Sequence, residues 1–237
     1  LIETLAAGKG GAPSHAADTR PVSTLPEVRK LAALIDHTLL RPEATRAQVE
    51  QLCHEAIEYG FAVVYVNPAW VPAARRILQS STVHVGTVAG FPLGATATSV
   101  KRAEAEAAMR MGAKEIDMVI NIGAMKSGDL ERVEADIRGV AEICRAGGAA
   151  LKVILDNAYL SDDEKVAACR LAQKAGADYV KTSTGFGPSG ATEADVRLMR
   201  QTVGPGMGVK AAGGIRTLAD ALRLLRAGAN RLGTSAG

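Results

Sequence analysis

The chain has few aromatic residues, few cysteines and no long hydrophobic run. Aromatic side chains make up only 3% of its 237 residues, which argues against a nucleic-acid surface built on stacked bases. The formal net charge of +3 is too small to indicate DNA or an anionic membrane as a partner. No apolar stretch approaches the ~18 residues of a membrane-spanning helix. We therefore expect no nucleic-acid partner and no membrane association.

The three cysteines form no redox or metal motif. Cys53, Cys144 and Cys169 are far apart in the sequence, and none belongs to a C-x-x-C pair. All three fall in segments with a helical pattern, where a buried thiol behaves as a small hydrophobic side chain. Because no signal peptide is visible, a reducing cytoplasm is the expected location.

The four histidines show no spacing typical of metal ligands. They are scattered at His15, His37, His54 and His84. Structural or exposed roles are favoured over catalysis or metal binding for each of them. The sequence therefore predicts neither a metal nor a cofactor.

The chain divides into a short extension and a regular repeat. Residues 1–25 are rich in Gly, Ala, Pro, Ser and Thr without periodicity, which predicts a flexible N-terminal extension. From residue 26 onward, helical segments end at glycine and short apolar strands follow. The junction glycines are Gly60, Gly112, Gly148, Gly176 and Gly228. Glycine is the expected residue there because it takes the left-handed conformation without a Cβ clash.

The repeat contains eight predicted strands with helices between them. The strands are Leu34–Thr38, Phe61–Val66, Thr82–Ala89, Glu115–Asn121, Ala150–Asp156, Asp178–Ser183, Gly208–Ala212 and Arg231–Thr234. The helices include Ser99–Met111, Asp129–Ala146, Ser161–Ala175, Thr192–Val203 and Thr217–Ala227. This alternation implies parallel pairing, and residues 26–237 are expected to form a single-domain (β/α)8 TIM barrel. Since the chain starts at Leu1 and stops at Gly237, directly after the eighth strand, we expect a longer protein whose final helix is missing here.

Two lysines inside predicted strands give the strongest functional signal. Lys181 lies in Tyr-Val-Lys-Thr-Ser-Thr-Gly and Lys210 in Gly-Val-Lys-Ala-Ala-Gly-Gly. Removing an ammonium from water is costly, so a lysine buried in this way tends to lose its proton. A neutral lysine amine attacks carbonyl carbon. The pattern favours an enzyme that forms a Schiff base.

Strand alternation adds two ionisable side chains to the same interior. Asp117 and Lys152 fall, like the two lysines, in the middle or toward the C-terminal end of a strand, where barrel enzymes carry catalytic groups. We expect three lysines to face one carboxylate, an imbalance that disfavours a purely structural ion-pair network. Lys210 would then disfavour the protonated form of Lys181, and Asp117 would transfer protons.

Small residues after the last three strands predict an anion site. The expected contacts are Thr184, Gly185, Gly213, Gly214, Gly233 and Ser235. In barrels, the loops after strands seven and eight commonly bind phosphate through backbone N–H groups. The alternative, that these glycines only permit tight turns, stays open.

One glycine pattern is discounted. The run from Gly185 to Gly190 fits G-x-G-x-x-G after a strand. Pro188 interrupts the turn, however, and no second strand ends in an acidic residue about 20 positions later. A nicotinamide dinucleotide is therefore not expected to bind.

Six motifs together resemble the class I deoxyribose-phosphate aldolases from about residue 30 to the end. They are Asp36-His37-Thr38-Leu39-Leu40, Val66-Asn67-Pro68, the run from Glu115 to Ala124, Leu151-Lys152-Val153-Ile154-Leu155, the run from Val180 to Phe186, and the run from Val209 to Thr217. The resemblance implies reversible cleavage of 2-deoxy-D-ribose 5-phosphate to D-glyceraldehyde 3-phosphate and acetaldehyde, in deoxyribonucleotide catabolism. It is also compatible with a homodimer.

The resemblance assigns roles to the residues already singled out. It implies that Lys181 forms the imine, that Lys210 lowers the pKa of Lys181, and that Asp117 transfers protons. Lys152 corresponds to a further active-site lysine that is expected to contact the substrate, and the glycines and Ser235 would hold the 5-phosphate.

Two positions depart from the family pattern. Tyr65 stands where cysteine is expected, and Asp156-Asn157 replaces the more usual Glu-Thr. Both bear on the surroundings of the acetaldehyde pocket and leave the lysine motifs intact. Two alternatives remain, namely another phosphosugar barrel enzyme and a non-catalytic barrel that binds a phosphate ligand.

Overall fold

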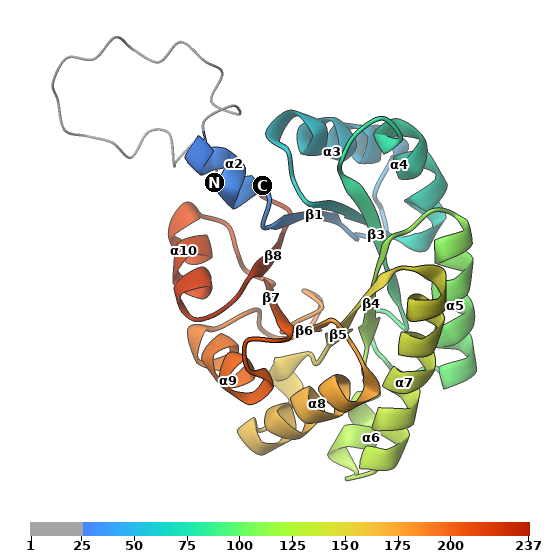
Figure 1. Ribbon diagram of the computed structural model, residues 1–237, viewed down its shortest axis with the longest axis vertical. Coiled ribbons are helices and arrows are strands. Elements are labelled where there is room, and N and C mark those ends of the chain that lie inside the picture. The colour runs from blue at the N-terminus through green and yellow to red at the C-terminus, as the bar shows by residue number, and fades with distance from the viewer. Residues whose placement is uncertain (1–25) are drawn as a thin grey trace, which may run out of the picture.

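Eight parallel strands close into a barrel in which each strand pairs with its neighbours in sequence and β1 pairs with β8 (Figure 1). The computed structural model describes residues 26–237, and the predicted extension over residues 1–25 lies outside them. The strands are β1 Ile35–Leu39, β2 Val63–Val66, β3 His84–Ala89, β4 Glu115–Val119, β5 Ala150–Ile154, β6 Tyr179–Lys181, β7 Gly208–Ala212 and β8 Arg231–Thr234. The predicted (β/α)8 TIM barrel is confirmed.

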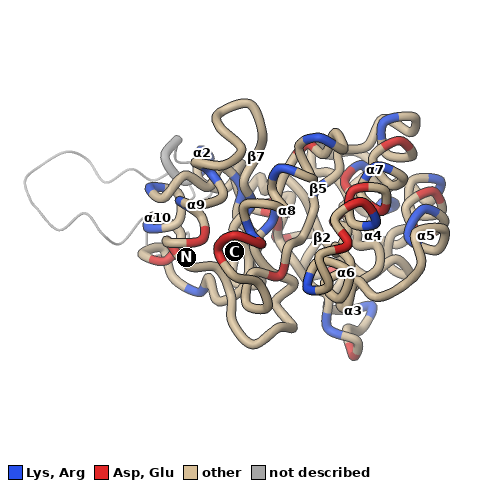
Figure 2. Tube along the Cα trace, turned by 90° about the horizontal axis from the view of Figure 1, so that it is seen from below, with Lys and Arg blue, Asp and Glu red and all other residues tan. Residues whose placement is uncertain are grey.

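Helices connect the strands and surround the ring (Figure 1). They are α2 Pro26–Ala32, α3 Arg46–Tyr59, α4 Val71–Leu78, α5 Thr98–Arg110, α6 Ile122–Lys126, α7 Leu130–Gly147, α8 Asp162–Ala175, α9 Glu193–Val203 and α10 Leu218–Arg226. Among these described helices, none has both the length and the apolar character needed to cross a bilayer. Figure 2 shows Lys and Arg interspersed with Asp and Glu along them.

The junction glycines adopt the backbone conformation for which they were singled out. Gly60, Gly148 and Gly176 are left-handed C-caps of α3, α7 and α8. Gly112 and Gly228 follow the last residues of α5 and α10 and have φ angles of 108° and 117°. Because a side chain is strained at such angles, each of these turns favours glycine.

Strands β4 and β5 end two residues earlier than predicted, because polar residues turn the chain at their C-terminal ends. Asn121, expected at the end of β4, is the N-cap of α6, and its Oδ1 accepts a hydrogen bond from the N–H of Ala124 at 3.0 Å. Asp156, expected at the end of β5, has a left-handed φ of 54°. Both residues therefore belong to the loops above the barrel.

The hydrophobic core lies between the strands and the helices, whereas the charged side chains lie inside the ring. The buried strand residues that face the helices include Ile116, Leu151, Val180, Val209 and Leu232. Each of them is adjacent in sequence to a charged residue, and successive side chains of a strand point to opposite faces. The charged residues of β4 to β8 consequently share the barrel interior.

A buried ion pair between Lys101 and Asp136 joins α5 to α7 outside the barrel. Lys101 Nζ lies 2.5 Å from Asp136 Oδ2 and donates to the carbonyl oxygen of Val119 at 2.8 Å. Both charged side chains are almost completely buried. The pair thus connects two helices to the end of β4.

Lys101→Met should destabilise the protein by about 3–5 kcal/mol, because the Asp136 carboxylate would stay buried without its cation. Urea unfolding of the purified variant measures this loss. The control is the double variant Lys101→Met/Asp136→Leu, which removes both charges and should recover most of the stability. A single variant with the wild-type midpoint would contradict the expectation.

Candidate active site

A cavity of about 850 Å³ opens above the C-terminal ends of β1, β6, β7 and β8 and beside α3. All six residues predicted to contact an anion line it, namely Thr184, Gly185, Gly213, Gly214, Gly233 and Ser235. Lys181 lines the same cavity. The barrel therefore brings the predicted anion site and the predicted nucleophile together in one space.

Lys181 contacts the other two predicted catalytic residues. Its Nζ donates a hydrogen bond to Asp117 Oδ2 at 2.8 Å, and Lys210 Nζ donates to the same oxygen at 2.8 Å. Lys210 Nζ also lies 2.6 Å from Asp36 Oδ2. The side chain of Lys181 is only 4% exposed, and those of Lys210 and Asp117 are still less exposed. The predicted triad is thus one contiguous buried cluster.

The environment of Lys181 favours a neutral amine. Burial lowers the pKa of Lys181, the nearby carboxylate of Asp117 opposes this effect, and the positive charge of Lys210 lowers the pKa further. The net direction is downward. Since the unprotonated amine is the nucleophilic form, the cavity floor carries a group suited to attack a carbonyl carbon.

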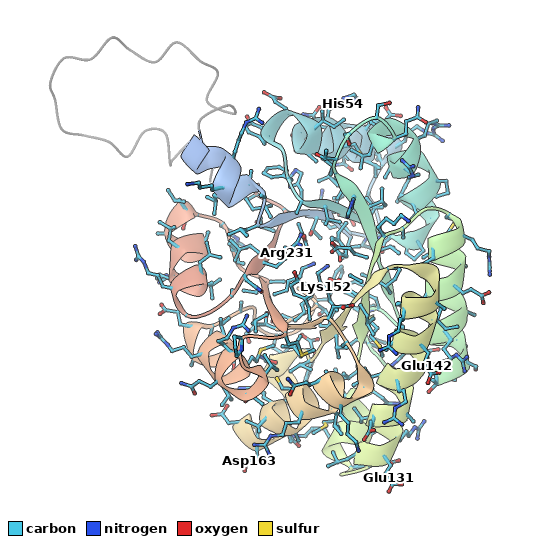
Figure 3. All side chains as sticks on the ribbon, in the orientation of Figure 1. His54, Glu131, Glu142, Lys152, Asp163 and Arg231 are labelled. Carbon is cyan, nitrogen blue, oxygen red and sulfur yellow. The ribbon has the colours of Figure 1, made fainter. Side chains whose placement is uncertain are left out.

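Lys152 lies deeper in the barrel and does not line the cavity. Its Nζ donates a hydrogen bond to the hydroxyl of Tyr65 at 2.8 Å and forms an ion pair with Glu115. Burial lowers the pKa of Lys152 well below its ordinary value, against the attraction of Asp36. Figure 3 shows Lys152 of β5 and Arg231 of β8 inside the ring of strands. Direct substrate contact by Lys152 therefore stays a prediction, and its observed contacts are with other protein groups.

The expectation that three lysines face a single carboxylate is wrong. Asp36 of β1 faces the same interior because closure of the barrel places it opposite Gly233 of β8. Glu115 faces it as well, since it precedes Asp117 by two residues on one strand. Three carboxylates therefore share the interior with the lysines.

The cations and carboxylates of the interior nearly balance. The basic groups are Lys152, Lys181, Lys210 and Arg231, and the acidic groups are Asp36, Glu115 and Asp117. With every group ionised, this set has one excess positive charge, which one neutral amine removes. Burial raises the pKa of Asp36, but Lys210, Lys152 and Arg231 together lower it below its ordinary value. The carboxylate of Asp36 is thus held ionised by the surrounding cations.

Three members of this network, Asp36, Glu115 and Arg231, were not given a role from the sequence, and Tyr65 was noted only as a departure from the expected family pattern. Glu115 could have been found by the same alternation that identified Asp117, and Asp36 and Arg231 are charged residues within predicted strands. Tyr65 gave no such signal, because it stands in the apolar run Val-Val-Tyr-Val. Its hydroxyl donates to Asp117 Oδ1 at 2.6 Å.

Asp156 orders the loop that carries Thr184 and Gly185. The Asp156 carboxylate accepts hydrogen bonds from the N–H of Thr184 at 3.2 Å and from its hydroxyl at 3.1 Å. Asp156 is itself buried and has a positive φ, a conformation that is costly for a residue with a Cβ. Asp156 thus supports the part of the cavity wall formed by Thr184 and Gly185.

The histidines and cysteines do not assemble into a second reactive centre in the described part of the chain. His37 lines the cavity and is hydrogen-bonded through Nε2 to Glu55 at 2.7 Å, while His54 lies on the outside of α3 (Figure 3). Cys53, Cys144 and Cys169 are buried free thiols, and burial raises the pKa of each to about 12. Within residues 26–237, no group of His, Cys, Asp and Glu is arranged to hold a metal ion.

Comparison with known proteins agrees with this geometry. Residues 30–237 match the model of the DeoC/LacD family of aldolases. The chain belongs to this family. It is 61% identical over 208 residues to the deoxyribose-phosphate aldolase of Streptococcus pneumoniae serotype 19F (strain G54). The matched region covers 88% of this chain and 94% of that protein.

Two solved structures of aldolases have the same fold. The tetrameric deoxyribose phosphate aldolase from Aeropyrum pernix is 36% identical with a TM-score of 0.84, over 90% of this chain and 89% of that one. An aldolase named QR15 is 39% identical with a TM-score of 0.83, over 90% and 93% of the two chains. The family assignment and the closed barrel are therefore established together.

Lys210 and Asp117 should affect the pKa of Lys181 in opposite directions, so removing one should raise it and removing the other should lower it. Lys210→Leu deletes a positive charge and should raise the pKa of Lys181, whereas Asp117→Asn deletes a negative charge and should lower it. The pH dependence of reductive trapping with acetaldehyde and cyanoborohydride measures both shifts. Midpoints that move in the same direction would show that the two contacts do not control the amine.

Proposed function

We propose that the protein is a class I deoxyribose-phosphate aldolase. It cleaves 2-deoxy-D-ribose 5-phosphate reversibly to D-glyceraldehyde 3-phosphate and acetaldehyde through a Schiff base on Lys181. One observation carries this proposal: among the three interior lysines, Lys181 alone lines the cavity, and burial lowers its pKa. Membership of the aldolase family supports the same reaction.

Asp117 is placed to move protons at the amine. Lys181 Nζ attacks the C1 aldehyde of the open-chain sugar to form a carbinolamine, which loses water to give the imine. With its Oδ2 2.8 Å from Nζ, the Asp117 carboxylate accepts and returns protons in these steps, directly or through one water. Lys210, bonded to the same oxygen, keeps the carboxylate facing the amine and adds positive charge beside it.

The carbon–carbon bond breaks while the imine withdraws electrons. The C3 hydroxyl loses its proton, the C2–C3 bond supplies the electron pair, and glyceraldehyde 3-phosphate leaves. The two-carbon enamine that remains on Lys181 is protonated at C2, and hydrolysis of the resulting imine releases acetaldehyde. Every step needs only the lysine amine, a proton carrier and water.

The glycine loops fit the 5-phosphate end of this substrate. Within residues 26–237, the backbone N–H groups of Gly185, Gly214 and Ser235 donate no hydrogen bond to the protein. All three residues line the cavity that Lys181 enters, and Gly185 and Gly214 have φ angles of 88° and 78°. Free N–H groups in such loops favour an anion.

The two alternative functions are less well supported. A non-catalytic barrel would gain little from four buried cations, because an apolar interior of similar volume is commonly as stable or more stable. Another phosphosugar enzyme would share the cavity, but the assignment to an aldolase family favours carbon–carbon cleavage. The aldolase reaction uses both the buried amine and the anion site.

The cellular setting is part of the same proposal. We place the reaction in deoxyribonucleotide catabolism in the cytoplasm, where the free thiols of Cys53, Cys144 and Cys169 stay reduced. A homodimer also stays a prediction, which light scattering on the purified protein would check.

Purified protein should release glyceraldehyde 3-phosphate from 2-deoxy-D-ribose 5-phosphate, measured by coupled oxidation of the triose product. With acetaldehyde and borohydride it should gain a reduced two-carbon adduct on Lys181, identified by mass spectrometry of peptides. Lys181→Met is the control and should show neither product. A wild-type protein that forms no adduct would rule out the Schiff-base mechanism.

Ser235→Asp should weaken binding of the phosphorylated sugar by placing a carboxylate beside the phosphate. Loss of one charge-assisted hydrogen bond, about 1.5–3 kcal/mol, predicts a rise in KM of at least ~10-fold. The kcat/KM for unphosphorylated 2-deoxy-D-ribose should stay nearly constant, and Ser235→Ala is the matched uncharged control. Equal losses with both sugars would show that Ser235 does not face the phosphate.

A further inference from the structure

Tyr65 lies at the junction of the charged network and is fully buried on β2. Its hydroxyl donates to Asp117 Oδ1 at 2.6 Å and accepts a hydrogen bond from Lys152 Nζ at 2.8 Å. The other oxygen of Asp117 bonds both Lys181 and Lys210. The phenol thus occupies the side of the carboxylate that faces away from the nucleophile.

The ring of Tyr65 fits only because its neighbour on β3 is glycine. Tyr65 pairs with Gly86 in the sheet, and a Cβ at Gly86 would lie 2.5–2.8 Å from three atoms of the ring. The φ of Gly86 is not in the left-handed range, so the backbone does not require glycine there. The space needed by the ring is therefore the physical reason for Gly86.

The surroundings keep the phenol a hydrogen-bond donor. Burial raises the pKa of Tyr65 well above its ordinary value, and the negative charge of Asp117 raises it further. Lys210 Nζ lies 3.7 Å from the centroid of the ring, a cation–π contact that holds the ring in place. A tyrosine hydroxyl has a single proton to donate. Its contact with Asp117 at 2.6 Å is shorter than its contact with Glu115 Oε2 at 3.2 Å, so the proton points to Asp117.

A cysteine could not make the same contacts. Its thiol ends one bond beyond Cβ and is a weak donor, so it would not reach the position of the phenolic oxygen. The contacts with Asp117 and Lys152 therefore require the longer side chain, and Gly86 leaves room for it.

We propose that Tyr65 is a positioning residue for the aldolase reaction: its hydroxyl fixes Asp117 with Oδ2 toward Lys181, and Gly86 provides the space for the ring. This role rests on the function proposed above. Without the phenol, Asp117 Oδ1 loses its 2.6 Å hydrogen bond and keeps Lys152 Nζ only at 3.9 Å, so the carboxylate can rotate away from the amine. Tyr65 acts through Asp117 and does not touch the substrate.

Tyr65→Phe should lower kcat about 10–100-fold, as expected for a lost hydrogen bond to a charged group, with KM for the sugar phosphate changed less than about 2-fold. The pKa of Lys181, read from the pH dependence of reductive trapping with acetaldehyde, should fall, because the Asp117 carboxylate that raises it is no longer held beside the amine. The groups that face Asp117 are Lys152, Lys181, Lys210 and Tyr65, with Asp36 and Glu115 beyond them. The borohydride adduct at Lys181 should still form.

Gly86→Ala distinguishes the effect of the Tyr65 hydroxyl from the effect of filling space with the ring. In the wild-type background the new methyl group displaces the ring and should reproduce the lower kcat and the lower pKa of Lys181. In the Tyr65→Phe background it should cost less than a further 2-fold, since the hydroxyl contact is already absent. A purely structural role predicts equal losses in both backgrounds, because the phenylalanine ring fills the same space.

The outcomes distinguish this role from the function on which it rests. A wild type that cleaves the sugar phosphate, with a Tyr65→Phe variant of equal kcat and unchanged Lys181 pKa, would overturn the role of Tyr65 alone. Losses from Gly86→Ala that are the same in both backgrounds would overturn it as well. A wild type that forms no adduct and cleaves nothing would overturn the function and, with it, this role. If Tyr65→Phe does not fold, the pKa of Lys181 in the Gly86→Ala variant decides.

Discussion

The interior of the barrel has to hold seven ionisable charges away from water, and the shape of the site follows from how these charges are neutralised. Each carboxylate contacts more than one cation, so no charge is left without a partner. A buried ion without a partner would cost several kcal/mol. With four basic and three acidic groups, the loss of one lysine proton is the simplest way to reach balance. Lys181 lines the cavity, where its neutral amine can reach the carbonyl carbon of a bound substrate.

The loops above the network suit the substrate that we propose. A sugar phosphate brings negative charge to the cavity, and the glycine loops after β6, β7 and β8 offer backbone donors to it. The phosphate end would be held by N–H groups and the aldehyde end would reach Lys181. Because the loops and the strands belong to one rigid barrel, the distance between the two ends is fixed by the fold.

Much of this arrangement could be read from local sequence. Glycines at the helix ends, such as Gly148 and Gly176, indicated the repeat, and period-two alternation placed Lys181, Lys210 and Asp117 on interior faces. Loop glycines such as Gly214 were found because barrels carry anion sites after their last strands. These features depend on short-range rules, which a single sequence carries directly.

Other features depend on contacts between distant segments and could not be predicted in this way. Asp36 joins the network only because β1 closes onto β8. Tyr65 was noted from the sequence without its contacts, and only the pairing of β2 with β3 shows that Gly86 accommodates its ring. The ends of β4 and β5 were misplaced because Asn121 and Asp156 form loop contacts instead of continuing the ladder.

The central claim is that burial and the positive charge of Lys210 hold the pKa of the Lys181 amine below that of an ordinary lysine. NMR titration of wild-type protein labelled at the lysine side chains tests it most directly, with the Lys181 signal assigned by its loss in a Lys181→Met variant. We predict that this signal titrates well below the exposed lysines. A Lys181 signal that titrates together with them would contradict the claim.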